Sequence, residues 1–295
     1  MPNPQLSAVP VGTSVKRKAA PRDDEGDESD GSDVSMINVD FDFYNLNPDV
    51  DQIAIKRLLR QTLSHDDHLI DVHQLADLIL AEGTRLKAGS TIKTDGEESD
   101  PWGMLAAVDI RKCQDNPALK PLIDYYLSTA PPAAIKSALT DGSSKPALLF
   151  SMRMLNLPLP LIPPLYKMLG EELSSAGFTH YILWGRGYKL EGAEEATGLE
   201  FDQSATNKKK KGGQAPGGLA AGSFTYHPEE EMIDSRAEAV HTYSLKTAPP
   251  RDDESFGVEQ FGRLLLVSSD KLAQAVGAME EACKPSFRVP NASAH

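Results

Sequence analysis

The residues in this sequence most suited to chemistry are histidines and aspartates that gather in one short segment. The run HDDHLIDVH contains His65, Asp66, Asp67, His68, Asp71 and His73. Imidazole and carboxylate groups bind metals, but on a helix His73 falls well off the face that His68 and Asp71 share. No distant Cys or His pattern completes a set of four ligands. The run therefore favours the polar start of a helix, and we predict no metal site.

Two further patterns are tested for catalysis or cofactor binding. Gly185 and Gly187 in WGRGYK lack the GK[ST] ending of a phosphate-binding loop and the strand-to-helix setting of a dinucleotide site. Cys113 and Cys283 have no nearby His, and GxSxG does not occur, so no activated nucleophile is indicated. We therefore predict no cofactor and no enzyme activity.

Carboxylates recur in segments that we expect to be exposed. They are Asp40 and Asp42 on a predicted strand, Asp95, Glu97, Glu98 and Asp100 in a predicted loop, Glu229, Glu230 and Glu231 in HPEEEM, and Asp252, Asp253 and Glu254 in RDDES. If several converge on one face, that face would attract a cationic protein and speed its association. We predict a partner-binding role for Asp40, Asp42, Glu97, Glu98, Asp100, Glu229, Glu230 and Glu231.

Length and composition bound the class of protein. The chain has 295 residues, 40% of them hydrophobic, which is enough for one large domain or two small ones. A net charge of −13 disfavours nucleic acid or an anionic membrane and favours a basic partner, although excess acid also simply maintains solubility. Two cysteines, no apolar leader and no long apolar run lead us to expect a soluble intracellular protein.

Residues 1–35 are expected to form a disordered tail, because they hold no aromatic residue and little that could build a core. The tail carries a basic cluster, Lys16, Arg17 and Lys18, which is a candidate nuclear signal. It also carries an acidic run, RDDEGDESDGSDV, which either keeps the chain soluble or attracts basic proteins.

The elements that must position these groups alternate between helix and strand. Alternating apolar residues predict a strand over Met36–Leu46, and periodicity predicts helices over residues 47–63 and 65–83 and over Pro117–Ser128. Further strands are predicted at residues 90–94, 102–110, 147–157, 179–192, 239–245 and 261–268, and further helices from Pro164 and over 269–284, capped by Ser269 or Asp270. Such interleaving predicts an α/β fold with a mixed sheet covered by helices.

A glycine-rich stretch interrupts this pattern at about residues 203–223. It contains Lys208 to Lys211, which could form a second import signal or a weak nucleic-acid contact, although no aromatic residues are interleaved to stack bases. Because strand-like and helix-like segments resume after it, we interpret it as a flexible insert. We predict a single α/β domain over residues 36–284, with a C-terminal tail at 285–295.

Four blocks, in this order, resemble the BCCIP family. After the acidic tail come INVDFDFYNLNPDVDQIAIKRLLRQ, then KPALLFSMRMLNLPLPLIPPLYKML, then HPEEEMIDSRA, and finally FGRLLLVSSDKLAQAVGAME. The resemblance covers about residues 36 to 284, and its motifs are core and surface segments without a catalytic signature. The glycine-rich insert is a departure in this chain.

The resemblance implies a non-enzymatic protein that shuttles between nucleus and cytoplasm, with a fold like that of GNAT acetyltransferases. It implies a dedicated chaperone for a basic large-subunit ribosomal protein, support for 60S ribosome biogenesis, and nuclear export of a phosphatidylinositol phosphate kinase. A hypothesis follows in which exposed carboxylates stand in for the RNA phosphates that such a client normally contacts. The alternatives are a scaffold for cell-cycle or DNA-repair proteins and a GNAT-type acetyltransferase.

Overall fold

The computed structural model describes residues 39–141, 145–191, 219, 223–250 and 257–284. The described residues belong to one compact unit that begins at Val39. The tail at 1–35 with Lys16, Arg17 and Lys18, the Lys208 to Lys211 cluster and the C-terminal tail lie outside the described residues, as do Asp252, Asp253 and Glu254.

Eight strands form one mixed sheet in the order β1-β2-β3-β4-β5-β8-β7, with β6 paired to β5. The strands are β1 (Asp42–Asn45), β2 (Ser90–Lys93), β3 (Gly103–Asp109), β4 (Pro146–Arg153), β5 (His180–Glu191), β6 (Ser223–Thr225), β7 (Ala239–Ser244) and β8 (Gly257–Ser268). Among the described strands, only β4 and β5 pair in parallel, and a helical crossover joins them. The predicted α/β fold with a mixed sheet is confirmed.

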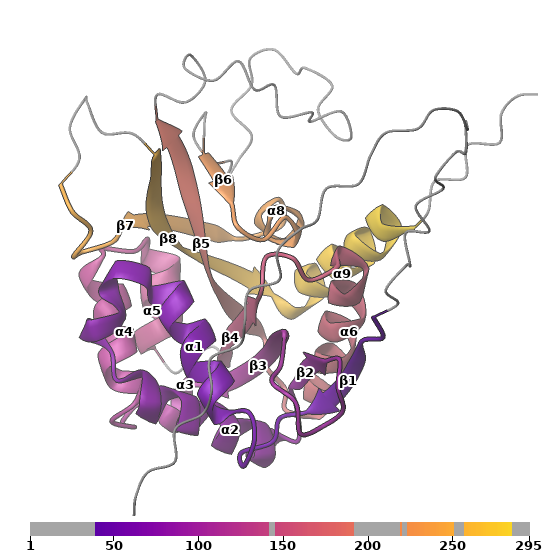
Figure 1. Ribbon diagram of the computed structural model, residues 1–295. Helices are drawn as coiled ribbons and strands as arrows, with labels where there is room; N and C mark the ends of the chain where they lie inside the picture. The colour runs from indigo at the N-terminus through magenta and orange to yellow at the C-terminus, as the bar shows by residue number, and fades with distance from the viewer. Residues whose placement is uncertain (1–38, 142–144, 192–218, 220–222, 251–256, 285–295) are drawn as a thin grey trace, which may run out of the picture. The chain divides into compact units, whose positions relative to one another are not determined.

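Helices cover both faces of the sheet (Figure 1). One face packs against α1 (Gln52–Leu63), α2 (Val72–Leu86), α3 (Ile110–Cys113), α4 (Leu119–Ser128) and α5 (Ala133–Thr140), and the 3₁₀ helix η1 (Ser64–Leu69) connects α1 to α2. The other face packs against α6 (Ile162–Glu172), which lies between the 3₁₀ turns η2 (Leu159–Leu161) and η3 (Leu173–Ser175), and against α8 (Glu229–Asp234) and α9 (Ser269–Cys283). The longer α-helices, α1, α2, α4, α6 and α9, each bury one apolar stripe, as a period of 3.6 residues requires.

Several predicted boundaries are corrected. The strand predicted from Met36 pairs only over Asp42–Asn45. The helix predicted from His65 begins instead at Val72, because the Asp71 carboxylate caps it by accepting the backbone N–H groups of His73 and Gln74. The N-cap of α9 is Ser268, without a side-chain cap bond, and neither Ser269 nor Asp270 occupies that position. The short elements α3, α5, β6 and α8 are not in the sequence prediction, because they are held mainly by tertiary contacts.

Candidate partner-binding surface

The first element of the candidate surface is β1, an edge strand that pairs only with β2. Asp40 and Asp42 are exposed at its start, as predicted. Phe41 and Phe43 pack against the core on the side of α6 and α9, and the Phe41 ring meets Trp102 edge-on at 5.8 Å. This end of the sheet therefore presents carboxylates beside partly exposed aromatic rings.

The second element is the loop that joins β2 to β3. Asp95, Glu97, Glu98 and Asp100 are all exposed on it, and we call it the acidic loop (residues 94–101). The loop closes because the backbone N–H of Trp102 donates a hydrogen bond to the Ile92 carbonyl at 2.7 Å. Its turn places Gly96 at φ +85°, a conformation that glycine adopts without strain. The loop is therefore a formed turn that holds its carboxylates toward solvent.

A buried lysine anchors the acidic loop from below. The Lys93 ammonium lies 2.7 Å from the Asp51 carboxylate, with both side chains fully buried, and it also donates to the Glu97 carbonyl. At the surface, Arg57 of α1 approaches Asp100 at 3.3 Å. A buried ion pair of this kind fixes position more than it adds stability. Because Lys93 pairs with the buried Asp51, it does not neutralise the exposed carboxylates of the acidic loop. These carboxylates therefore remain available to a partner.

Strand register brings the two elements together. Asp42 lies opposite Lys93, so the residues that precede β1 and those that follow β2 are at the same end of the sheet. Asp40 and Asp42 therefore share this end with the acidic loop, which we call the acidic end (Asp40, Asp42, Asp95, Glu97, Glu98 and Asp100). Six exposed carboxylates lie at this end. Among the described residues, the structure gives them one ion pair, between Arg57 and Asp100.

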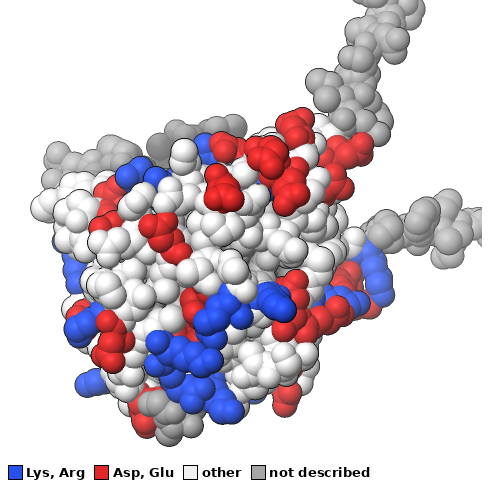
Figure 2. All heavy atoms as spheres, turned by 90° about the horizontal axis from the view of Figure 1, so that it is seen from below, with Lys and Arg blue, Asp and Glu red and all other residues white. Residues whose placement is uncertain are grey.

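The opposite end of the sheet is basic, so the carboxylates do not cover the whole molecule. Asp109 lies opposite Ala147, which brings Arg111 and Lys112 close to Lys145. Arg85 and Lys87 at the end of α2 join them, since Arg85 lies 3.9 Å from Asp109. Figure 2 shows Lys and Arg side chains in a group on one face, with several Asp and Glu at its upper edge and others beside the group. This face is thus not uniformly negative.

The predicted exposure of Glu229 and Glu230 is wrong. Both are buried in α8, 5% and 3% exposed, because two strand arginines, Arg153 and Arg263, need anionic partners there. Glu229 accepts two bonds from Arg153, at 2.9 and 2.8 Å. Of the three predicted glutamates in HPEEEM, only Glu231 is exposed.

Arg263 contacts two further acids, Asp234 and Glu230. It donates to Asp234 at 2.7 Å and lies 3.6 Å from Glu230, whose carboxylate packs directly over Gly185. Burial raises the pKa of Glu229, but bonds from Arg153 and His227 outweigh burial and lower it to about 2. Burial raises the pKa of Glu230 to about 8, despite the attraction of Arg263. We call Arg153, Arg263, Glu229, Glu230 and Asp234 the α8 charge cluster.

A sequence signal for this cluster does exist. Arg153 and Arg263 each interrupt an otherwise apolar strand, LLFSMRM and FGRLLLV. A cation inside a strand that is buried on both faces needs an anion beside it. The pattern indicates that some acids must be buried, although it does not say which ones.

The other candidate sites from the sequence, the HDDHLIDVH run and the glycines of WGRGYK, have structural roles. Asp66 is buried and accepts bonds from the Tyr125 hydroxyl at 2.7 Å and from the backbone of Lys246 and Thr247, so it ties three elements together. Within the described ranges, no group of three or more His, Cys, Asp or Glu is arranged to hold a metal. Gly185 and Gly187 lie in the middle of β5, away from any strand-to-helix junction. No described helix is long and apolar enough to cross a bilayer.

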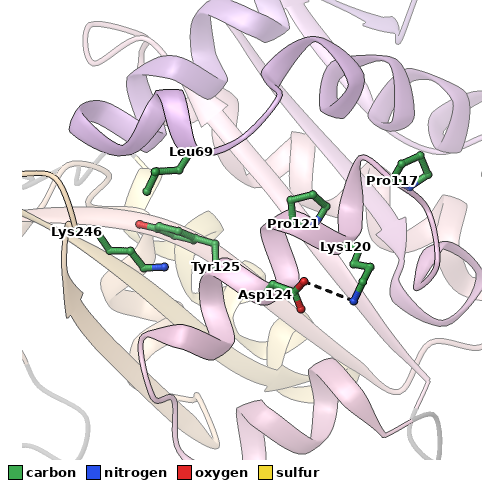
Figure 3. Close-up of a pocket in the computed structure, with 7 residues that line it drawn as sticks. All are labelled: Leu69, Pro117, Lys120, Pro121, Asp124, Tyr125 and Lys246. Atoms are coloured by element: carbon green, nitrogen blue, oxygen red, sulfur yellow. Dashed lines mark ion pairs between the residues drawn. The ribbon is translucent and has the colours of Figure 1, made fainter.

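A shallow hollow of about 650 Å³ lies beside Tyr125 and Lys246, the two residues that bond to Asp66 (Figure 3). Its lining comprises Leu69, Pro117, Lys120, Pro121, Asp124, Tyr125 and Lys246. Lys246 lies over the Tyr125 ring at 4.5 Å, and Lys120 pairs with Asp124 at 3.5 Å. Both lysines and the carboxylate thus have partners, and the lining contains no histidine, cysteine or serine that could act as base or nucleophile.

Comparison with known proteins gives consistent matches. The family model BCCIP matches residues 36–233. "Protein bcp1" of Aspergillus oryzae is 33% identical over 280 residues, covering 88% of this chain and 92% of that protein. "Protein bcp1" of Schizosaccharomyces pombe is 31% identical, covering 84% and 91%.

Solved structures also match. The crystal structure of BCP1 from Saccharomyces cerevisiae has a TM-score of 0.58 and 26% identity, covering 87% of this chain and 94% of that one. The aminoglycoside 6'-N-acetyltransferase from Enterococcus faecium has a TM-score of 0.35 and 10% identity, covering 78% and 96%.

Proposed function

The chain belongs to the BCCIP family, and on that premise we propose that it is a non-enzymatic chaperone that shields a basic ribosomal protein of the large subunit. The observation that carries the proposal is the acidic end of the sheet. Its carboxylates are exposed on a formed loop and an edge strand, beside the partly exposed rings of Phe41 and Trp102.

Electrostatics explains why such a surface suits a ribosomal protein. A protein that normally contacts RNA phosphates carries many Lys and Arg side chains, which attract polyanions before assembly. Carboxylates on a fixed loop can occupy those side chains reversibly, since exposed ion pairs are individually weak and respond to salt. Aromatic rings beside the acids would add the apolar contacts that choose one client among many basic proteins.

Two features support the non-enzymatic part of the proposal. Acetyl-CoA binding would need free backbone N–H groups where a strand leads into a helix. At the junction of β4 and α6, the turn η2 and the start of α6 contain Pro160, Pro163 and Pro164, which have no N–H to donate. The glycines of WGRGYK leave no room for a ligand, because Phe261 and Glu230 pack against them.

The rest of the proposal concerns location and cargo. We propose that the protein is nuclear and shuttles to the cytoplasm through the transport machinery, with Lys16, Arg17 and Lys18 as an import signal. In this scheme it supports 60S ribosome biogenesis and the nuclear export of a phosphatidylinositol phosphate kinase, without direct contact with nucleic acid or membrane. The support is the BCCIP family resemblance and the overall negative charge.

Affinity capture from nuclear extract tests the function. The bait is the full chain, compared with Glu97→Lys/Glu98→Lys and with a control, Asp115→Lys/Glu281→Lys, that carries the same charge change on exposed residues elsewhere. We expect one basic large-subunit ribosomal protein to be enriched by the wild type and the control and lost with the loop variant. Enrichment of a DNA-repair or cell-cycle protein that is indifferent to the loop variant would overturn the proposal in favour of a scaffold.

A further inference from the structure

A groove of about 550 Å³ lies between α6 and α9, on the face of the sheet opposite α1 and α2. The two helices run side by side in Figure 1. The groove is lined with aromatic and aliphatic side chains, among them Tyr166, Leu169, Phe178, Tyr181, Leu272 and Val276. Its size and apolar lining are typical of sites that receive bulky apolar side chains.

Two glycines keep the space above the lining open. Gly170 lies in α6 and Gly277 in α9, and both line the groove. A Cβ atom added to either would meet nothing within 4 Å. Glycine lowers helix stability relative to alanine, and no group among the described residues fills the space that these two glycines leave. Within the part of the chain that the structure describes, the groove is therefore open at these two positions.

The rim of the groove carries more acid than base. Glu171 is exposed on α6, and Glu280 of α9 lies 3.8 Å from Lys167 across the groove. Lys167 and Glu280 offset each other, which leaves the Glu171 carboxylate among the residues that line the groove. A segment that brings apolar side chains to the floor would thus meet a favourable field if it also carried Lys or Arg.

We propose that this groove binds a basic amphipathic segment of a partner protein, with its bulky apolar side chains on the floor and its Lys or Arg side chains toward Glu171 and Glu280. The inference relies on the proposed function only for the basic character of the partner. The apolar lining, the two glycines and the rim charge are independent of the acidic end of the sheet.

A glycine substitution tests the groove without endangering the fold. Gly277→Leu should fill the groove, while its melting temperature should equal or exceed that of the wild type, because leucine favours a helix and its Cβ meets no atom. The matched control is Gln274→Leu, which places the same side chain on an exposed position of α9 outside the groove.

The probe is a fluorescein-labelled synthetic peptide with leucines at helical spacing and lysines elsewhere, measured by fluorescence anisotropy. We expect Gly277→Leu to weaken binding about tenfold or more and Gln274→Leu to change it less than about twofold. A scrambled peptide of the same composition should bind poorly, and Glu171→Lys should weaken binding of the ordered one. Equal binding by wild type and Gly277→Leu, with both folded, would overturn the inference.

One further variant separates this inference from the proposed function. Glu97→Lys/Glu98→Lys changes the acidic loop and should leave peptide binding within about twofold of wild type. If the peptide fails to bind the wild type, the groove inference falls while client binding at the acidic loop is untouched. If the loop variant abolishes peptide binding and Gly277→Leu does not, the peptide binds at the acidic loop and the inference is wrong.

Discussion

Two acidic segments of this protein differ in burial: the carboxylates of one are exposed, and most of those of the other are buried. DGEESD forms the acidic loop, with exposed carboxylates, whereas EEEMID forms α8 and buries three of its four acids against Arg153 and Arg263. In each case a buried cation decides the outcome. Lys93 binds Asp51 and a backbone carbonyl of the loop, and so leaves the loop carboxylates free. The two arginines bind carboxylates directly, so the acids of α8 serve the fold and those of the loop can serve a partner.

The largest effect is expected at Arg263. Arg263→Met would leave the Asp234 carboxylate buried without its cation and Glu230 without its neighbour, which should cost about 3 to 5 kcal/mol of unfolding free energy. Urea denaturation measures it. The triple variant Arg263→Met/Glu230→Gln/Asp234→Asn should recover part of the loss. A loss below about 1 kcal/mol would mean that α8 is not held by this cluster.

A substitution of Lys93 tests how the acidic loop is anchored. Lys93→Met should cost about 3 kcal/mol, because Asp51 stays buried without its partner. It should also speed amide hydrogen exchange across residues 95–100, since the Glu97 carbonyl loses its donor. The control Lys93→Met/Asp51→Asn should restore part of the stability but not the protection of the loop. Unchanged exchange in the single variant would show that the loop holds itself.

A pH titration sharpens the comparison, because α8 contains a glutamate, Glu230, whose pKa is raised by burial. The pKa of Glu230 is about 8 in the folded protein, against 4.5 for an ordinary glutamate. Between these values the folded state keeps a proton that the unfolded state releases, so the free energy of unfolding falls as pH rises. The slope is at most about 1.4 kcal/mol per pH unit from this group.

The measurement is chemical denaturation at pH 5, 6, 7 and 8. Glu230→Gln should flatten the decline relative to wild type. Parallel curves for wild type and Glu230→Gln would contradict the assignment.

The smallest effect is expected at the surface ion pair. Arg57→Ala removes the contact with Asp100, which is partly exposed at both ends, and should cost only about 0.2 to 1 kcal/mol. Because it also removes a positive charge beside the acidic loop, it should strengthen binding of a basic protein at low salt. Isothermal calorimetry with the captured client would detect this. Weaker binding would place Arg57 itself in the interface.

Sequence reasoning predicted the mixed sheet and most helices, because alternation and helical periodicity record which side chains face the core. It placed Asp40, Asp42, Glu97, Glu98 and Asp100 at the surface correctly. It misplaced Glu229 and Glu230, because burial of a carboxylate is decided by a partner far along the chain: Arg153 lies 76 residues from Glu229. The arginines inside two apolar strands were the available signal.

The shorter elements were harder to predict for a related reason. α8 has six residues and α3 has four, too few for a helix to form on propensity alone. The groove between α6 and α9 depends on two helices that are about a hundred residues apart in sequence, and glycines inside a helix ordinarily count against that helix. Both features follow from the assembled sheet rather than from any local pattern.

Salt dependence of client binding tests most directly whether the acidic end of the sheet is the partner-binding surface. The wild type is compared with Asp40→Asn/Asp42→Asn/Glu97→Gln/Glu98→Gln, with the captured basic protein as ligand at 50 and 500 mM salt. We predict that the variant binds about tenfold more weakly at low salt and that the gap closes to about twofold at high salt. Equal affinity of the two proteins at low salt would contradict the account.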